Sequence, residues 1–194
     1  MVGLSVEFYV YEDELWCRYS DGNTFLVDET QVELVSYVLN NVRARYPDAY
    51  KALEEHYKKS AVNVRYYQYL MVRRFCKCNF ATLDSTMRDV ESISRDGVFH
   101  FEKISCPLRG GDCPYENKIC MPKFDSELSK AENRVMTLLY NGLTKDEIGE
   151  ALYISPGTVK NHIKNAYLKL GVHSEAEFVK YATDHNIFKE SIKE

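Results

Sequence analysis

The sequence predicts an α+β protein that is mainly helical, with a mixed α/β N-terminal domain over residues 1–124 and a four-helix domain over residues 125–194. All six cysteines lie before residue 124, whereas the chain after it has no cysteine and carries a series of helix-capping residues. Between the two regions, Met121-Pro122-Lys123-Phe124-Asp125-Ser126 interrupts the periodicity with proline and small polar residues. The 194 residues are enough for two small domains with buried cores.

The composition excludes several kinds of protein. The residues are 45% hydrophobic and 28% charged, with a formal net charge of −4. No apolar run approaches the ~20 residues that span a bilayer, and the N-terminus lacks the basic segment and apolar stretch of an export signal. We therefore expect a cytoplasmic protein without a membrane partner. Mild acidity argues against a general nucleic-acid coat, but the placement of charge matters more than its sum.

The N-terminal domain is expected to begin with a small sheet followed by helices. β-branched and aromatic residues alternate with polar ones in short segments, and Asp21-Gly22-Asn23 is a turn sequence. The predicted strands cover residues 5–11, 15–19 and 25–27. Apolar residues then recur at helical spacing, and Pro47 suits a first helical turn. The predicted helices cover residues 30–46, 47–59 and 63–76, and strand-like alternation returns at 98–104.

Four successive helix starts in the C-terminal domain are marked by capping residues. In a capping box, a hydroxyl and a carboxylate three residues later satisfy free N–H groups of the first turn. The pairs with this spacing are Ser129–Glu132, Thr144–Glu147 and Ser174–Glu177. Ser155 before Pro156 marks the remaining start, and Gly142 and Gly171 stand where helices are expected to end.

The second and third of these helices are joined by a very short link. Only Tyr153-Ile154-Ser155 separates them, which is the connection of a helix-turn-helix, and Gly149 lies where the two helices would cross closely. Four residues of the third helix recur at helical spacing and are expected to face the core: Val159, Ile163, Ala166 and Leu170. The outer face then carries Lys160, Asn161, Lys164 and Asn165.

The charge distribution around this third helix is informative. No Asp or Glu occurs from Ala151 through Ser174, while lysines do. A helix with lysine and amide side chains and no acid can neutralise phosphates and contact base edges in the major groove. The helix start at Ser155 and Thr158 can also donate to a phosphate. The alternative is a small helical bundle whose lysines form an ordinary solvated face.

Several motifs together resemble the LuxR/GerE-type DNA-binding domain. They are Leu128-Ser-Lys-Ala-Glu132, Gly142-Leu-Thr-Lys-Asp-Glu-Ile-Gly-Glu-Ala-Leu152, Ile154-Ser-Pro-Gly-Thr-Val-Lys-Asn-His-Ile-Lys164 and Lys169-Leu-Gly-Val-His-Ser-Glu-Ala-Glu177. The resemblance implies a bacterial transcription regulator that binds double-stranded DNA with the third helix, residues 155–170, in the major groove. It also implies a homodimer paired through the fourth helix.

The resemblance assigns roles to individual side chains. The candidates for contact with base edges are Lys160, Asn161 and Lys164. The candidates for phosphate contact are Ser155, Thr158, His162 and Lys169, although His162 is equally compatible with a packing role. On the fourth helix, Phe178, Val179 and Ala182 are compatible with either the core or a dimer surface.

The cysteines form a second pattern. Cys106, Cys113 and Cys120 are separated by two equal six-residue gaps in a segment rich in proline and glycine. Such a loop has no hydrophobic core of its own, and a thiolate-bound Zn²⁺ would stabilise it. Cys76 is in helical step with the apolar face of its helix, whereas Cys78 lies past the expected helix end. We therefore predict a structural zinc site formed by Cys78, Cys106, Cys113 and Cys120.

Other roles for these cysteines remain open. The six-residue gaps exceed the spacing of a zinc knuckle, and an iron–sulfur cluster uses the same ligands. Buried or redox-active free thiols are a further alternative, and Cys17 is expected to be a core residue. The acid-free stretch from Lys58 to Lys77 is compatible with a solvated face, an auxiliary DNA surface or the basic shell of a thiolate cluster.

Nothing in the sequence indicates an enzyme or a small-molecule ligand. No P-loop, nucleophile elbow or His-rich metal motif is present. A phosphoacceptor receiver domain does not fit, because the only aspartate between Thr30 and Phe80 is Asp48, within a helical pattern. The alternatives to a DNA-binding regulator are a protein-interaction adaptor of the transcription machinery and a thiol- or metal-based sensor that controls DNA binding.

Overall fold

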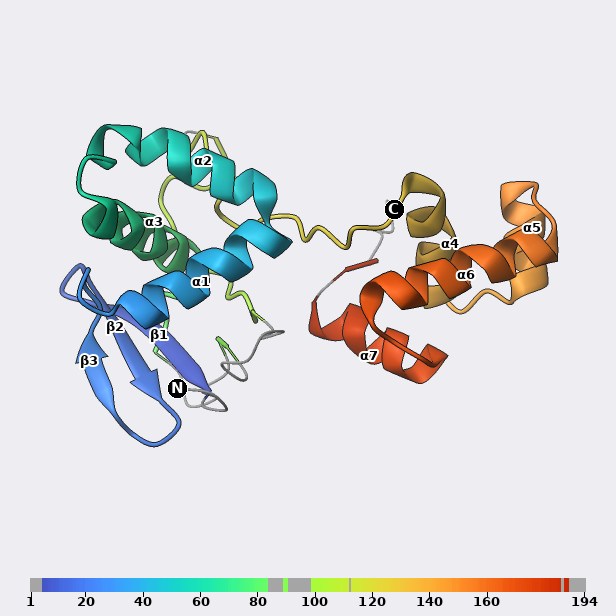
Figure 1. The fold of residues 1–194 in the computed structure, drawn as a ribbon, viewed down its shortest axis with the longest axis horizontal. Helices are drawn as coiled ribbons and strands as arrows, with labels where there is room; N and C mark the ends of the chain where they lie inside the picture. The colour runs from blue at the N-terminus through green and yellow to red at the C-terminus, as the bar shows by residue number, and fades with distance from the viewer. Residues whose placement is uncertain (1–4, 84–88, 91–98, 112, 186, 189–194) are drawn as a thin grey trace. The chain divides into compact units, whose positions relative to one another are not determined.

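The computed structural model describes residues 5–83, 89–90, 99–111, 113–185 and 187–188 (Figure 1). The chain divides into two compact units, Met1–Phe124 and Asp125–Glu194. Each unit has its own hydrophobic core.

The N-terminal unit begins with a three-stranded antiparallel sheet in the order β1-β2-β3. The strands are β1 (Val6–Tyr11), β2 (Glu14–Tyr19) and β3 (Thr24–Leu26), as the alternation of apolar residues predicted. Glu12 and Asp13 form the two-residue turn between β1 and β2, and both have positive φ angles of 50° and 66°. This is the backbone conformation that matches the twist of a tight hairpin.

Three helices follow and pack with the sheet around one core. They are α1 (Val32–Arg45), α2 (Pro47–Tyr57) and α3 (Val64–Asn79), with a short 3-10 turn η1 (Lys58–Ser60) after α2. The three predicted helices are therefore confirmed. Tyr46 and Phe75 lie at the centre of an aromatic cluster that also contains Phe80, Phe99 and Phe101, with neighbouring rings 5.2 to 6.3 Å apart.

Two local predictions in this unit are wrong. Helix α3 continues to Asn79, so Cys78 lies within the helix and not beyond its end. The described residues 99–104 form no strand, and Phe99 pairs only with Val90 in an isolated bridge, while Val98 lies outside the described residues. The aromatic alternation at Phe99 and Phe101 instead reflects two rings that both pack into the aromatic cluster.

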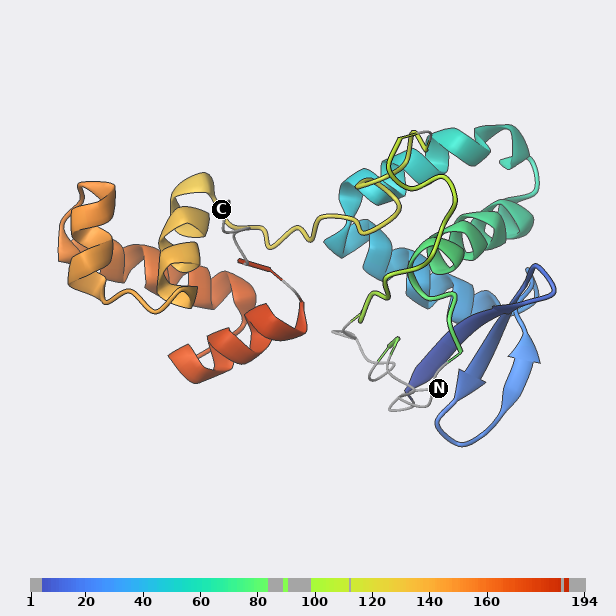
Figure 2. The same ribbon diagram turned by 180° about the vertical axis from the view of Figure 1, so that it is seen from behind.

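The end of the N-terminal unit is a long irregular segment. The described residues between Ile104 and Phe124 contain turns but no helix or strand. Figure 2, which shows the chain from behind, follows this yellow-green segment across the helices of the unit. Its Tyr115 hydroxyl lies 2.8 Å from Nδ1 of His56 on α2, and Arg74 of α3 lies over the Tyr115 ring at 5.6 Å. The segment is therefore held by contacts with helices far away in the sequence.

In its described residues, the C-terminal unit has four helices whose starts follow the predicted caps. They are α4 (Lys130–Tyr140), α5 (Lys145–Leu152), α6 (Pro156–Leu170) and α7 (Glu175–Asp184). Complete capping boxes start α4 and α5. At α7, Ser174 accepts from the Glu177 N–H at 3.2 Å, but the Glu177 carboxylate accepts from the N–H of His173, so this third box is incomplete.

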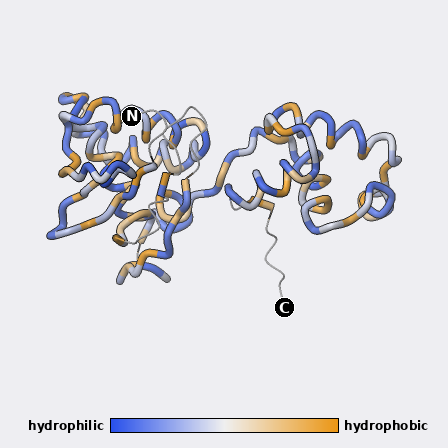
Figure 3. Tube along the Cα trace, turned by 90° about the horizontal axis from the view of Figure 1, so that it is seen from below, coloured by the Kyte–Doolittle hydropathy of each residue, from blue (hydrophilic) through white to orange (hydrophobic). Residues whose placement is uncertain are grey.

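Hydrophobic residues are distributed along the helices at intervals rather than in continuous runs. Figure 3 shows hydrophobic (orange) positions alternating with hydrophilic (blue) ones along the chain. Each helix can therefore bury one face and expose the other. Among the described residues, no helix combines the length and apolar character that a membrane crossing needs.

Candidate functional site

The turn between α5 and α6 sets the close packing of these two helices. Tyr153 ends α5 in the left-handed conformation, with φ of 56°, and Ser155 Oγ accepts the Thr158 N–H at 3.1 Å to start α6. A Cβ atom on Gly149 would lie 2.9 Å from the Ile154 carbonyl oxygen. The expected close approach at Gly149 is thus confirmed, because any side chain there would collide with backbone.

Helix α6 has one buried and one exposed face. The four residues predicted to face the core are buried: Val159, Ile163, Ala166 and Leu170. The four residues predicted on the outer face are exposed: Lys160, Asn161, Lys164 and Asn165. Ser155 is also exposed at the start of the helix, whereas Thr158 and His162 are half-buried. The structure therefore gathers the proposed base-contacting side chains on one accessible surface.

A third lysine lies near this surface, and the sequence analysis missed it. Lys145 from the first turn of α5 lines the same shallow depression of about 360 Å³ as Lys160 and Lys164 of α6. Lys145 belongs to a different helix from Lys160 and Lys164, and it comes close to them only because α5 packs against α6. No local sequence pattern indicated this proximity.

Lys169 has a partner inside the domain. Its Nζ donates to Oε2 of Glu132 at 2.6 Å, and the Glu132 side chain is only 7% exposed. The hydrogen bond from Lys169, together with the N–H of Ser129, lowers the pKa of Glu132 to about 2. This pair joins α6 to the start of α4, which is a structural role that the prediction of phosphate contact did not include.

Of the three α7 residues that the sequence left undecided between the core and a dimer surface, two lie in the core and one lies on the surface. Phe178 and Ala182 are fully buried in the core of the unit. Val179 is 41% exposed and lies on the outer side. Of the three α7 residues, Val179 is therefore the one that a second subunit can reach.

The α5–turn–α6 arrangement defines the class of this domain. A pair of helices with a three-residue link and a basic, acid-free second helix is a helix-turn-helix, the kind of domain that places its second helix in the major groove of DNA. Residues 126–182 match the family described as bacterial regulatory proteins, luxR family. The C-terminal third of the chain is thus a LuxR-family helix-turn-helix domain, which confirms the resemblance.

Known regulatory proteins are similar to this chain over 57 to 71 residues. The Fimbriae Z protein of Salmonella typhimurium is 40% identical over 63 residues, which are 32% of this chain and 30% of that protein. Transcriptional regulatory protein LnrK of Bacillus subtilis is 37% identical over 71 residues, 37% of this chain and 32% of that protein. The HTH-type transcriptional regulator MalT of Yersinia pestis is 40% identical over 57 residues, 29% of this chain and 6% of that protein.

The chain therefore spans about a third of the length of the first two relatives and a far smaller part of MalT. No solved structure matches the chain. The match to the family, over residues 126–182, lies within the C-terminal unit.

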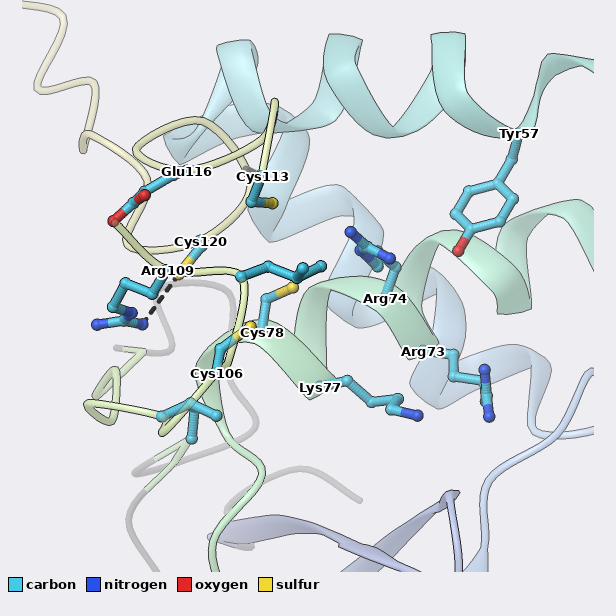
Figure 4. Close-up of a pocket in the computed structure, with 12 residues that line it drawn as sticks. Tyr57, Arg73, Arg74, Lys77, Cys78, Cys106, Arg109, Cys113, Glu116 and Cys120 are labelled. Carbon is cyan, nitrogen blue, oxygen red and sulfur yellow. Dashed lines mark hydrogen bonds between the residues drawn. The ribbon is translucent and has the colours of Figure 1, made fainter. Parts of the chain in front are cut away.

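The N-terminal unit contains a pocket lined by the four cysteines that the sequence singled out. Cys78 reaches it from α3, and Cys106, Cys113 and Cys120 reach it from the irregular segment (Figure 4). The pocket has a volume of about 230 Å³. Among the described residues, no three His, Cys, Asp or Glu side chains are arranged to hold a metal ion. The zinc site remains a prediction, since the thiols surround a cavity and do not converge on one point.

The remaining two cysteines are core residues, as expected. Cys17 and Cys76 are both fully buried. Burial raises the pKa of each thiol, so both are held in the neutral form. Cys106, in contrast, is exposed, and the other three pocket cysteines are partly accessible.

Basic residues surround the thiol pocket. Arg73, Arg74 and Lys77 of α3 and Arg109 of the irregular segment line it. Arg73 and Lys77 also bind Asp13 in the hairpin turn, with Arg73 Nη2 at 3.0 Å from Oδ2, and this lowers the pKa of Asp13. Three basic residues of the acid-free stretch thus line the pocket, which fits the interpretation of the stretch as the basic shell of a thiolate cluster.

The Cys78 thiol lies close enough to the other three pocket thiols to be affected by them. Burial raises the pKa of the Cys78 thiol, the Arg74 guanidinium lowers it, and the neighbouring thiols of Cys120, Cys113 and Cys106 raise it further. Repulsion between thiolates is relieved when a cation, or a cluster with a positively charged core, binds between them.

Proposed function

We propose that the chain is a bacterial transcription regulator that binds double-stranded DNA with α6 in the major groove. The observation that carries this proposal is the exposed face of α6, where Lys160 and Lys164 alternate with Asn161 and Asn165 and no acid is present. Lysines there neutralise phosphates, and the amides can pair with base edges. This side chain composition supports binding that depends on both salt and sequence.

The first turn of α6 supports a phosphate contact. Ser155 is exposed, no acidic residue lies in the first turn, and the helix dipole places partial positive charge there. Lys145 adds a cation beside Lys160 and Lys164. We propose that the DNA phosphate backbone passes the start of α6 and the lysines Lys145, Lys160 and Lys164. The base edges would then lie beneath the middle of α6.

We further propose that two copies bind an imperfect palindrome as a homodimer, so that two α6 helices enter successive major grooves. Val179 on the exposed side of α7 is the residue through which the two C-terminal units would meet. The N-terminal unit would then supply regulation or additional dimer contacts, and the protein would act in the cytoplasm and not as an enzyme.

The test is selection of binding sites from a random duplex library with the full chain, followed by affinity measurements at several salt concentrations. Lys160→Ala with Lys164→Ala should weaken binding at least about 10-fold and reduce the steepness of the salt dependence by about one to two counterions. The matched control is Lys51→Ala with Lys130→Ala, which removes the same charge from exposed lysines outside α6. Equal losses in the two double variants, or no duplex selected, would overturn the proposal.

A further inference from the structure

We propose that the pocket formed by Cys78, Cys106, Cys113 and Cys120 binds an iron–sulfur cluster through their four thiolates. This site lies entirely within the N-terminal unit, so it does not depend on the proposed DNA binding. The proposal rests on how the four cysteines are positioned, on the donors that surround them and on the size of the space between them.

The fold holds the cysteine segment against α3 through a buried amide. Asn79 follows Cys78 and is fully buried, and its Nδ2 donates to the Ile119 carbonyl at 2.9 Å. Its Oδ1 accepts the Met121 N–H, also at 2.9 Å. These two bonds bracket Cys120 and fix it relative to Cys78, although the two cysteines lie far apart in sequence.

The other two cysteines each begin a tight turn. In both cases proline follows the cysteine, and the cysteine carbonyl accepts an N–H three residues on: Arg109 N–H to Cys106 at 3.1 Å and Glu116 N–H to Cys113 at 3.3 Å. Proline in this position favours the turn. The two repeated Cys-Pro turns therefore both bring a thiol to the same pocket (Figure 4).

Unsatisfied donors surround the pocket. The Nε atoms of Arg74 and Arg109 are buried and make no hydrogen bond within the described part of the chain. Arg109 Nη2 already donates to Cys120 Sγ at 3.0 Å. A buried donor without an acceptor is costly, and an acceptor bound in the pocket that both arginines line would satisfy such donors. The thiolates and inorganic sulfides of an anionic cluster are such acceptors.

The size of the pocket favours a cluster over a single ion. Zn²⁺ requires four sulfur atoms at about 2.3 Å, and its structural sites usually have ligands spaced two to four residues apart. The longer gaps between the loop cysteines do not separate the two groups, because the ligands of a cluster are also commonly spaced two to four residues apart. The described thiols, however, line a space of about 230 Å³ without converging on a point. A group with several metal atoms can touch all four sulfurs across such a space.

A role as a core residue does not explain the exposure of Cys106. The two core cysteines, Cys17 and Cys76, are both fully buried among apolar side chains. Cys106 is exposed, and the irregular segment around it buries few apolar side chains besides Ile119. A bound group would add to the contacts through Tyr115 and Asn79 that already hold the segment.

The experiment is anaerobic purification of the full chain, with measurement of iron, acid-labile sulfide and zinc, and of the visible absorption spectrum. The expected result is iron and sulfide in a ratio of about one to one, with charge-transfer absorption in the visible region. Stoichiometric zinc without sulfide would overturn the cluster and support the zinc site instead. Protein without either metal, also after reconstitution with ferrous iron and sulfide, would overturn any metal site.

Single substitutions then test the ligand set. Cys78→Ser, Cys106→Ser, Cys113→Ser and Cys120→Ser should each lose most of the iron and sulfide. The matched control is Cys76→Ala, two residues from Cys78 but buried in the core, which should retain the wild-type amounts. Retention in the four pocket variants would overturn the assignment. Since the wild-type metal and sulfide content is measured independently, a variant that fails to fold leaves the proposal testable.

Discussion

The two units of this protein specify their structures in different ways. In the C-terminal unit, each helix begins at a capping serine or threonine, and two of the four starts are complete capping boxes. In the N-terminal unit, the cysteine segment has no regular structure and is positioned by side chains from helices elsewhere in the chain. The difference shows that the DNA-binding domain is defined largely by local chemistry, whereas the thiol pocket is defined by long-range contacts.

The largest expected effect concerns the buried amide that holds the cysteine segment. Asn79→Ala leaves the Ile119 carbonyl and the Met121 N–H without partners, and the cost should be about 2–4 kcal/mol of unfolding free energy for the N-terminal unit. Urea denaturation followed by Trp16 fluorescence measures it. Asn41→Ala is the control, because the side-chain hydrogen bond described for Asn41 runs to Tyr37 in its own helix. Equal losses of unfolding free energy in the two variants would contradict the larger contribution expected of the long-range bonds.

The next effect tests the close packing of α5 against the turn. Gly149→Ala places a Cβ 2.9 Å from the Ile154 carbonyl oxygen, so the turn must shift, and we expect a loss of about 1–3 kcal/mol in the C-terminal unit. Gly157→Ala is the control within the same motif, since its Cβ would meet only Ser155 Oγ at 3.7 Å. Alanine there should be neutral or slightly stabilising. A tolerated Gly149→Ala would contradict the crossing geometry.

A smaller effect concerns the one long-range ion pair described in the C-terminal unit, between Lys169 and Glu132. Lys169→Ala should cost about 1–2 kcal/mol at neutral pH, because the buried carboxylate loses its charged donor. Lys180→Ala, which removes an exposed pair with Asp184 within α7, should cost only a few tenths of a kcal/mol. Thermal denaturation of both variants provides the comparison.

The same pair has a defined pH dependence. The pKa of Glu132 lies below its ordinary value, so its contribution to stability is present above pH 4.5 and is lost as the pH falls toward about 2. In Lys169→Ala the pKa should rise toward its ordinary value, and the acid-dependent loss attributable to Glu132 should largely disappear. An unchanged acid transition in the variant would show that Lys169 is not the cause of the lowered pKa.

Much of the candidate DNA surface was predictable because it depends on short-range patterns. Helical spacing separated Val159 and Ile163 from Lys160 and Lys164, and the structure places these pairs on opposite faces of α6. The identity of the four pocket cysteines was also predictable from their clustering, although the reason given for Cys78 was wrong. It lies inside α3, one residue before the Asn79 anchor.

The sequence by itself determined the helix ends of the C-terminal unit and the two faces of α6, because caps and helical periodicity act between residues at most a few positions apart. Only the tertiary structure decided the partner of Lys169, 37 positions away, and the bond from Asn79 to Ile119, 40 positions away. It also decided the approach of Lys145 to α6 and the gathering of four thiols around one pocket. Such contacts depend on how whole helices and segments pack, and no local pattern encodes that arrangement.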